Sequence, residues 1–328
     1  MQRRYATLIG LAGMLVCAAK GSAQTDPEPP APHPCDTHSG ATLAVCRAGY
    51  DALTTTTPFA ALLATGGNPV LGTAAGGRGF GDIGVTFRVN GLRAVVPSTV
   101  YNGSTDTVPA LRRASFVTPR LDLRLGLFAK ALPVGAASAD FLASVTAMPD
   151  NAADYFRFTP DARRVAGMNL GFGYGLRLGF VPTAAMPTVS LNVGRSDLPK
   201  FSVGNLNAGS DYAYTLAVSA ITTRLMLGHQ FGAFEFTAGG GADLIKGSYS
   251  VVFRDPATGL ASPRADSTVS TMRIVTAPNF AVRLGSVARL TLEGGFQVGK
   301  GDGQTTIFAA SDTRSGRFFG GAGLGFKL

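Results

Sequence analysis

The chain alternates, over long stretches, between apolar residues and small or polar ones. In residues 169–180 every even position is Leu, Phe or Tyr, whereas the odd positions are Asn, Gly or Arg. A two-residue period places the apolar side chains on one face of a β-strand, and no helix separates the two kinds of residue in this way. The same alternation recurs in residues 83–89, 121–127, 234–238, 280–284 and 290–298.

The segments between turn-rich connections predict about ten antiparallel strands. An even number leaves both ends of the sheet on the same side. Asn90-Gly91 is a strong hairpin signal, and a turn there, or pairing of residues 304–311, would raise the count to 12 or 14. The expected strands cover residues 80–97, 114–130, 139–148, 166–181, 187–195, 212–230, 233–255, 267–284, 288–299 and 315–328.

The first 23 residues have the pattern of a secretory signal peptide. Arg3 and Arg4 precede an apolar run from Tyr5 to Ala19, and small residues end at Ala23. This order of basic, apolar and small residues is typical of a segment that is removed after export. We therefore expect residues 1–23 to be a signal peptide.

Composition narrows the fold class of the exported chain. Gly makes up 43 of 328 residues, only 15% are charged, and the mean hydropathy is +0.20. After residue 23 the sequence shows no segment apolar and long enough to span a bilayer as a helix, and a closed barrel is the other structure that spans one. The prediction is an all-β protein with one antiparallel transmembrane β-barrel in residues 80–328. A secreted β-sandwich, with its apolar faces turned inward, has the same periodicity and remains the alternative.

Residues 24–79 precede the barrel and contain the cysteines Cys35 and Cys46. A Pro-rich linker comes first. In an oxidising compartment the close pair favours a disulfide, which stabilises by about 3 kcal/mol on the loop-entropy estimate. Nearby His33 and His38 suggest zinc as the alternative, but the spacings are not the usual ones.

The same segment has helical periodicity. Leu43, Cys46, Tyr50 and Leu53 recur at helical spacing, and residues 59–64 follow Pro58 as a second short helix. These helices either plug the barrel or remain in the periplasm.

The connections alternate in length, and aromatic residues collect near the short ones. Short periplasmic turns, long outer loops and aromatic girdles are typical of membrane barrels. The long connections lie near residues 98–113, 148–164, 196–211, 256–266 and 300–315, and the aromatic residues near the short turns are Phe128, Phe180, Phe231, Phe234 and Phe326.

The C-terminus carries a resemblance. Gly323, Phe326 and Leu328 match a glycine followed by two apolar residues in alternating register, although Leu328 replaces the usual terminal aromatic residue. This ending resembles the terminal strand signal of bacterial outer-membrane β-barrel proteins. The resemblance implies location in the bacterial outer membrane, insertion by the outer-membrane assembly machinery and a lipid bilayer as partner. A plug-like segment before a barrel also loosely resembles fatty-acid transporters.

The strand register places charged residues on the inner face of the barrel, with basic residues in excess. Such a lumen either attracts anions as a narrow pore or is filled by charges that pair across it. The expected lumen-lining residues are Arg88, Arg120, Asp122, Arg124, Arg177, Glu235, Arg283, Arg289, Glu293 and Arg317.

Other kinds of chemistry find little support in the sequence. Removing Arg3, Arg4 and Lys20 with the signal peptide lowers the net charge from +9 to +6, and the remaining basic residues are scattered, which argues against nucleic-acid binding. His229 lies beside a short turn rather than a long loop, and the chain shows no nucleophile elbow, phosphate loop or zinc-protease motif. We expect no enzyme activity, no cofactor and no metal.

The sequence predicts a porin-like channel or transporter for a small or hydrophobic solute. Residues 35–79 would then restrict its inner mouth. The alternative is a non-conducting structural or adhesive barrel whose outer loops bind partners.

Overall fold

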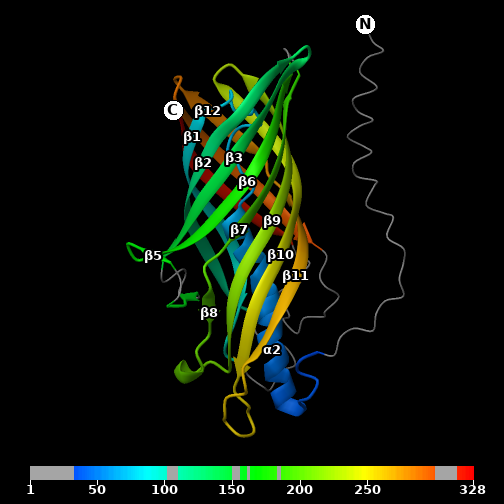
Figure 1. The fold of residues 1–328 in the computed structure, drawn as a ribbon. Helices are drawn as coiled ribbons and strands as arrows, with labels where there is room; N and C mark the ends of the chain where they lie inside the picture. The colour runs from blue at the N-terminus through cyan, green and yellow to red at the C-terminus, as the bar shows by residue number, and fades with distance from the viewer. Residues whose placement is uncertain (1–32, 102–109, 150–155, 161–162, 183–185, 300–315) are drawn as a thin grey trace, which may run out of the picture. The chain divides into compact units, whose positions relative to one another are not determined.

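In the computed structural model the body of the protein is a closed ring of antiparallel strands (Figure 1). The ring has ten strand positions. Each strand pairs with the next along the chain, and β14 closes the ring on β1, where Phe87 pairs with Leu324. β11 and β12 together occupy one position, since both pair with β10 and with β13. The ring strands are β1 (Ile83–Pro97), β2 (Ala110–Leu132), β3 (Gly135–Pro149), β6 (Met168–Pro182), β7 (Thr188–Asp197), β9 (Tyr212–Phe231), β10 (Phe234–Phe253), β11 (Ala265–Thr276), β12 (Asn279–Leu284), β13 (Ala288–Gly299) and β14 (Arg317–Lys327).

The structure describes residues 33–101, 110–149, 156–160, 163–182, 186–299 and 316–328. The predicted signal peptide, residues 1–23, lies outside them. The chain divides into two units, residues 1–37 and 38–328. In the first unit residues 33–37 form a turn, in which Asp36 N donates to His33 O at 2.9 Å.

The barrel confirms the fold class and the count of ten strands. The possible turn at Asn90-Gly91 does not form, because β1 runs through it: Asn90 pairs with Thr118 of β2 and Gly321 of β14. The strand expected over residues 267–284 is interrupted between β11 and β12, where Pro278 has no backbone N–H to donate.

Short turns and long connections lie at opposite ends of the ring. β2–β3, β9–β10 and β12–β13 turn tightly at the end where β1 begins and β14 ends, which we call the short-turn end (Figure 1). The other end is the long-loop end. Its connections contain β4 (Arg157–Phe158), β5 (Arg164–Val165), β8 (Phe201–Val203) and the 3-10 helix η2 (Leu206–Ala208).

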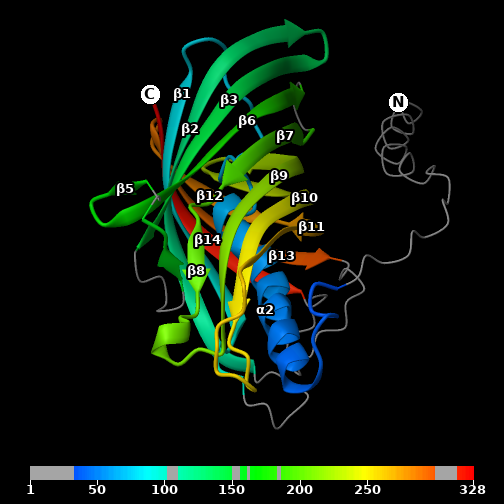
Figure 2. The same cartoon turned by 60° about the horizontal axis from the view of Figure 1, so that its bottom comes forward.

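One long helix, α2 (Gly40–Thr65), lies inside the ring (Figure 2). The prediction of two helices separated at Pro58 was wrong, because the helix continues through this proline. Proline removes one helical hydrogen bond, but α2 is buried against β1, β7, β9, β10 and β11, and this packing outweighs local propensity. Within the described residues, no helix is both long and apolar enough to cross a membrane.

The exterior of the ring is apolar toward the short-turn end. Phe87, Leu176, Phe236 and Leu292 come from four different strands and are each at least half exposed. A continuous apolar surface around a closed ring needs lipid to cover it. The fold is therefore that of a membrane-spanning β-barrel, and the apolar side of the alternation faces lipid in this half.

Candidate functional site: a lumen filled by the N-terminal segment

The lumen is occupied by residues 40–82, which we call the plug. The plug consists of α2 and the irregular segment 66–82, here called the lumen segment. At the long-loop end Thr42 Oγ1 donates to Asp255 Oδ1 at 2.6 Å. At the short-turn end Gly126 N donates to Asp82 O at 2.8 Å. The plug therefore runs through the barrel from one end to the other, rather than restricting only the inner mouth.

The helix and the strands around it form an apolar core in the long-loop half of the barrel. Phe59 lies 5.4 Å from Phe116 and 5.9 Å from Phe156, measured between ring centroids, and Phe156 contacts Phe201 at 4.3 Å. All four rings are nearly or fully buried. This half of the lumen is packed like the interior of a soluble protein.

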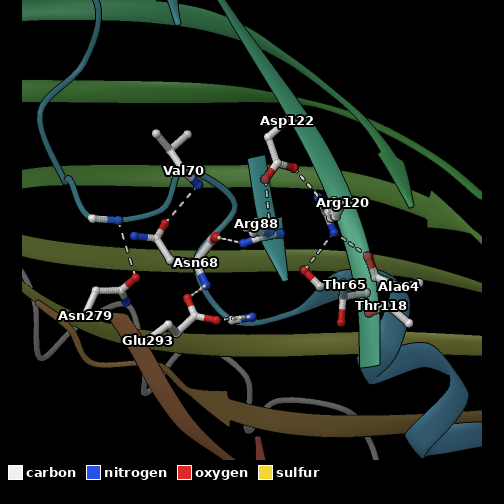
Figure 3. A network of polar contacts seen from close by, with 12 residues as sticks. Ala64, Thr65, Asn68, Val70, Arg88, Thr118, Arg120, Asp122, Asn279 and Glu293 are labelled. Carbon is white, nitrogen blue, oxygen red and sulfur yellow. Dashed lines mark hydrogen bonds and ion pairs between the residues drawn. The ribbon is translucent and has the colours of Figure 1, made fainter. Parts of the chain in front are cut away.

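The lumen segment is held differently, by polar side chains of the wall that bind its backbone (Figure 3). Glu293 accepts hydrogen bonds from Gly67 N at 3.1 Å and from Asn68 N at 2.8 Å. Arg88 Nη1 donates to Asn68 O at 2.8 Å. One carboxylate and one guanidinium therefore bind neighbouring peptide groups of the plug.

Further wall residues bind the plug backbone before and after Gly67 and Asn68. These contacts spread over β2, β3, β6, β9, β13 and β14, so nearly the whole circumference contributes. The donors are Arg120 to Ala64 O and Thr65 O, Arg224 to Gly67 O, Arg289 to Gly72 O, Arg177 to Thr73 O and Arg317 to Thr55 O, and the acceptor Asp140 binds Gly77 N.

The wall charges also pair with one another. Asp122 bridges Arg88 at 2.9 Å and Arg120 at 2.6 Å, and Arg224 binds Asp243 at 2.5 Å. These side chains are nearly inaccessible to solvent, so removing one partner leaves an uncompensated buried charge at a cost of about 3–5 kcal/mol. The network keeps the guanidinium groups oriented toward the plug.

The structure places all ten predicted lumen residues on the interior side of the ring. Arg88, Arg120, Asp122, Arg177, Glu235 and Glu293 are buried, and Arg124, Arg283, Arg289 and Arg317 are half-buried. Glu235 faces Arg289 at 3.4 Å and Arg283 at 3.9 Å, and Arg124 contacts Asp82 at 3.2 Å.

The sequence prediction missed several interior residues, among them Asp140, Arg224, Asp243 and Asn279. Each contacts the plug or pairs with a residue that does. A charged residue among apolar neighbours on β3, β9 or β10 was a usable signal, because such a residue in a membrane strand faces the lumen.

Close approach of the lumen segment to the wall depends on glycine. Gly66 has φ +61°, which side chains rarely adopt, and it ends α2. A Cβ on Gly67 would lie 2.6 Å from Ala277 Cβ and 2.7 Å from Glu293 Oε1. A larger residue at position 67 would displace the segment from Glu293.

Space remains beside the lumen segment in the short-turn half. A cavity of about 450 Å³ lies between this segment, the β12–β13 turn and the ends of β1, β2 and β14. Its basic lining residues are Arg78, Arg124, Arg283, Arg289 and Lys327. A second cavity of about 60 Å³ shares Val70, Gly84, Thr86 and Arg124 with the first and extends to β6 and β7.

One carboxylate at the long-loop end, outside the membrane-spanning half, has a lowered pKa. Hydrogen bonds from Thr42 Oγ1, Ala257 N and Thr258 Oγ1 lower the pKa of Asp255. The contact at the start of the plug is therefore made by an ionised carboxylate near neutral pH.

Cys35 and Cys46 form a disulfide, which confirms the predicted pairing over the zinc alternative. His229 lies near the short-turn end of β9, 4.4 Å from the ring of Phe231. At the C-terminus Gly323 pairs with Arg88 and Thr291, Phe326 pairs with Val85, and Leu328 N donates to Ile83 O at 3.0 Å. The terminal segment thus completes the ring.

No protein-family model and no curated protein matches the chain. Solved structures of similar fold include the outer membrane protease OmpT from Escherichia coli, with 11% identity, a TM-score of 0.37, and coverage of 76% of this chain and 97% of that one. The translocator domain of the autotransporter NalP from Neisseria meningitidis has 13% identity, a TM-score of 0.35, and coverage of 77% and 90%. The TodX monoaromatic hydrocarbon channel has 9% identity, a TM-score of 0.30, and coverage of 75% and 89%.

Proposed function

We propose that the protein is a normally closed channel for small anionic solutes, and that displacement of the plug, beginning with the lumen segment, opens it. The observation that carries this proposal is the difference in how the plug is held. Side-chain hydrogen bonds retain the lumen segment beside cavities of about 450 and 60 Å³, whereas apolar packing retains most of α2, with Arg120 and Arg317 bound to its backbone. Water that enters the lumen can replace such bonds one at a time, and each bond to a charged group is worth about 1.5–3 kcal/mol net.

The charge of the wall supports an anionic solute. The 450 Å³ cavity is lined by Arg78, Arg124, Arg283, Arg289 and Lys327, against the single carboxylate of Asp82 in the same lining. Displacing the lumen segment would also free Arg88, Arg177 and Arg224 from its carbonyl groups. Rings of arginine attract anions at close quarters.

The substitution Glu293→Gln tests this proposal in the full chain. The amide cannot accept from both Gly67 N and Asn68 N as the carboxylate does. Losing hydrogen bonds to a charged group costs about 1.5–3 kcal/mol, which corresponds to an open fraction about 10–100 times larger. We expect anion-selective current steps in planar bilayers to become correspondingly more frequent.

Glu235→Gln is the matched control. Glu235 is also a buried wall carboxylate, but it faces Arg283 and Arg289 rather than the backbone of the plug. Its substitution leaves both hydrogen bonds from Glu293 to the plug in place, so the opening frequency should rise much less than in Glu293→Gln. Equal activity of the two variants, or silence of Glu293→Gln in a correctly folded barrel, would refute the gating proposal.

A glycine pair provides an independent comparison. Gly67→Ala introduces a Cβ into the contact with Glu293 and Ala277, whereas Gly294→Ala on β13 meets nothing within 4 Å. Overpacking costs about 1–3 kcal/mol. We therefore expect Gly67→Ala, and not Gly294→Ala, to increase the current.

The second candidate is a non-conducting structural or adhesive barrel. The aromatic core around Phe59 favours it, since this core closes the long-loop half of the lumen whatever the lumen segment does. Silence of all these variants would support that function. We propose either barrel function over an enzyme, because His229 lies at the short-turn end, beside Phe231.

A further inference from the structure

The direction of the plug through the barrel is fixed by contacts at its two ends. His38 packs edge-on against Phe253, at the last residue of β10, with 5.3 Å between ring centroids. Thr42 binds Asp255 in the connection that follows β10. The lumen segment ends at Asp82 beside Gly126, where β1 begins at the short-turn end. The chain therefore enters the barrel at the long-loop end and leaves the lumen at the short-turn end.

Strand length shows that the long-loop half extends beyond the membrane. β9 and β10 each contain 20 residues. A tilted strand needs only about 9–11 residues to span the hydrocarbon core. About half of each strand must therefore lie outside the lipid.

The exterior residues identify which half that is. On β9 the outward residues near the short-turn end are Leu225 and Leu227, each nearly half exposed. Toward the long-loop end of β9 and β10 most outward positions are small or polar. They are Ala213, Thr215, Ala217, Ser219, Lys246 and Ser248, and Val252 is the apolar exception.

The short-turn end, which also holds both ends of the barrel, is the periplasmic end in bacterial barrels. We propose that the plug crosses the outer membrane from the outside inward, so that the chain leaves the barrel at His38 on the cell surface. This topology goes beyond the channel proposal, since it holds whether or not the lumen conducts.

Cysteine accessibility on intact cells tests the topology. Ser39 precedes α2 and is exposed, and Ala257 is exposed in the connection between β10 and β11. Ser286 is exposed in the β12–β13 turn at the opposite end. We expect Ser39→Cys and Ala257→Cys to react with a membrane-impermeant maleimide on intact cells. Ser286→Cys should react only after the outer membrane is permeabilised.

The three positions separate the possible errors. Labelling of Ala257→Cys but not Ser39→Cys on intact cells would overturn the proposal, because the start of the plug would not then be outside. Labelling of Ser286→Cys alone would show that the barrel is inverted, which also overturns it. Neither result concerns conduction, so the channel proposal stands or falls separately.

A crosslink covers the case in which Ser39→Cys disturbs the neighbouring Cys35–Cys46 disulfide. Thr42 and Asp255 touch across the long-loop end, so Thr42→Cys/Asp255→Cys should form a disulfide in the folded full-length barrel, read by mass spectrometry of the linked peptides. Thr42→Cys/Ser286→Cys, with partners at opposite ends, should not. A heat-modifiable, folded barrel in which the first pair stays reduced under oxidising conditions would refute the threading.

Discussion

The two halves of this barrel have the same alternating sequence pattern, but the apolar face points outward in one half and inward in the other. In the short-turn half the exterior is apolar and faces lipid, and the interior carries the charged network of Arg88, Asp122 and Glu293. In the long-loop half the interior holds Phe59, Phe116 and Tyr214, while mostly small and polar residues face outward on β9 and β10. The first half is solvated by lipid outside, and the second is a water-exposed protein with an apolar core.

The halves also differ in what holds the plug. Apolar contacts retain α2, and they are lost only if the helix moves into water or lipid. Hydrogen bonds and ion pairs retain the lumen segment, and their net worth is small because water competes for the same groups. Displacement of the plug should therefore begin in the lumen segment, before α2 leaves its apolar core.

The largest expected effect comes from the apolar core. Phe59→Ala removes a fully buried ring that contacts Phe116 and Phe156, at a cost of about 3–5 kcal/mol. Phe236→Ala removes the same ring from the lipid-facing exterior, where lipid fills the space, and should cost much less. Urea unfolding of both variants in phospholipid bilayers, followed by heat-modifiable gel migration, measures the difference. Equal losses of unfolding free energy in the two variants would contradict the assignment of Phe59 to a packed core and of Phe236 to the lipid-facing exterior.

Exterior charge gives the next largest effect. Leu225→Lys places a charge on the apolar exterior of β9, where lysine costs about 2–4 kcal/mol at the bilayer midplane. Ser219 lies six residues nearer the long-loop end of the same strand. Ser219→Lys should fold with nearly unchanged stability because water reaches this position. The same urea titration compares them. A similar penalty at residue 219 would place that half of β9 within the lipid.

The smallest effect concerns pH at the start of the plug. The Thr42 hydrogen bond lowers the pKa of Asp255 below its unfolded value, so the ionised contact stabilises above that unfolded value and is lost as pH falls through the folded one. We expect amide protection at residues 43–46, corrected for intrinsic exchange, to fall at acidic pH. Thr42→Ala should reduce this pH dependence, and an unchanged profile would show that the contact is not made in solution.

Much of the fold was predictable because its signal is local. The ten strands follow from two-residue periodicity. The disulfide follows from two close cysteines in a chain that is expected to reach an oxidising compartment. The Asn90-Gly91 turn was wrongly allowed as an option, since dipeptide preference gives way to pairing on both sides of β1. Pro58 likewise misled, because burial of α2 outweighs one lost hydrogen bond.

The candidate site was only partly predictable. Alternation places a side chain on one face or the other, but it does not say whether that face meets lipid, water or protein. Tyr212, Tyr214 and Leu216 have the periodicity of lipid-facing residues and yet contact the interior. The contacts of Glu293 and Arg224 with Gly67 join residues more than 150 positions apart, and a single sequence carries no signal for such pairs.

Conductance of the barrel with and without residues 24–79 tests most directly whether the plug closes the lumen. We expect near silence from the full chain and a steady anion-selective current from the shortened one, with heat-modifiable migration confirming that both are folded. A full chain that conducts as well as the shortened one, or a folded shortened barrel that remains silent, would contradict this expectation.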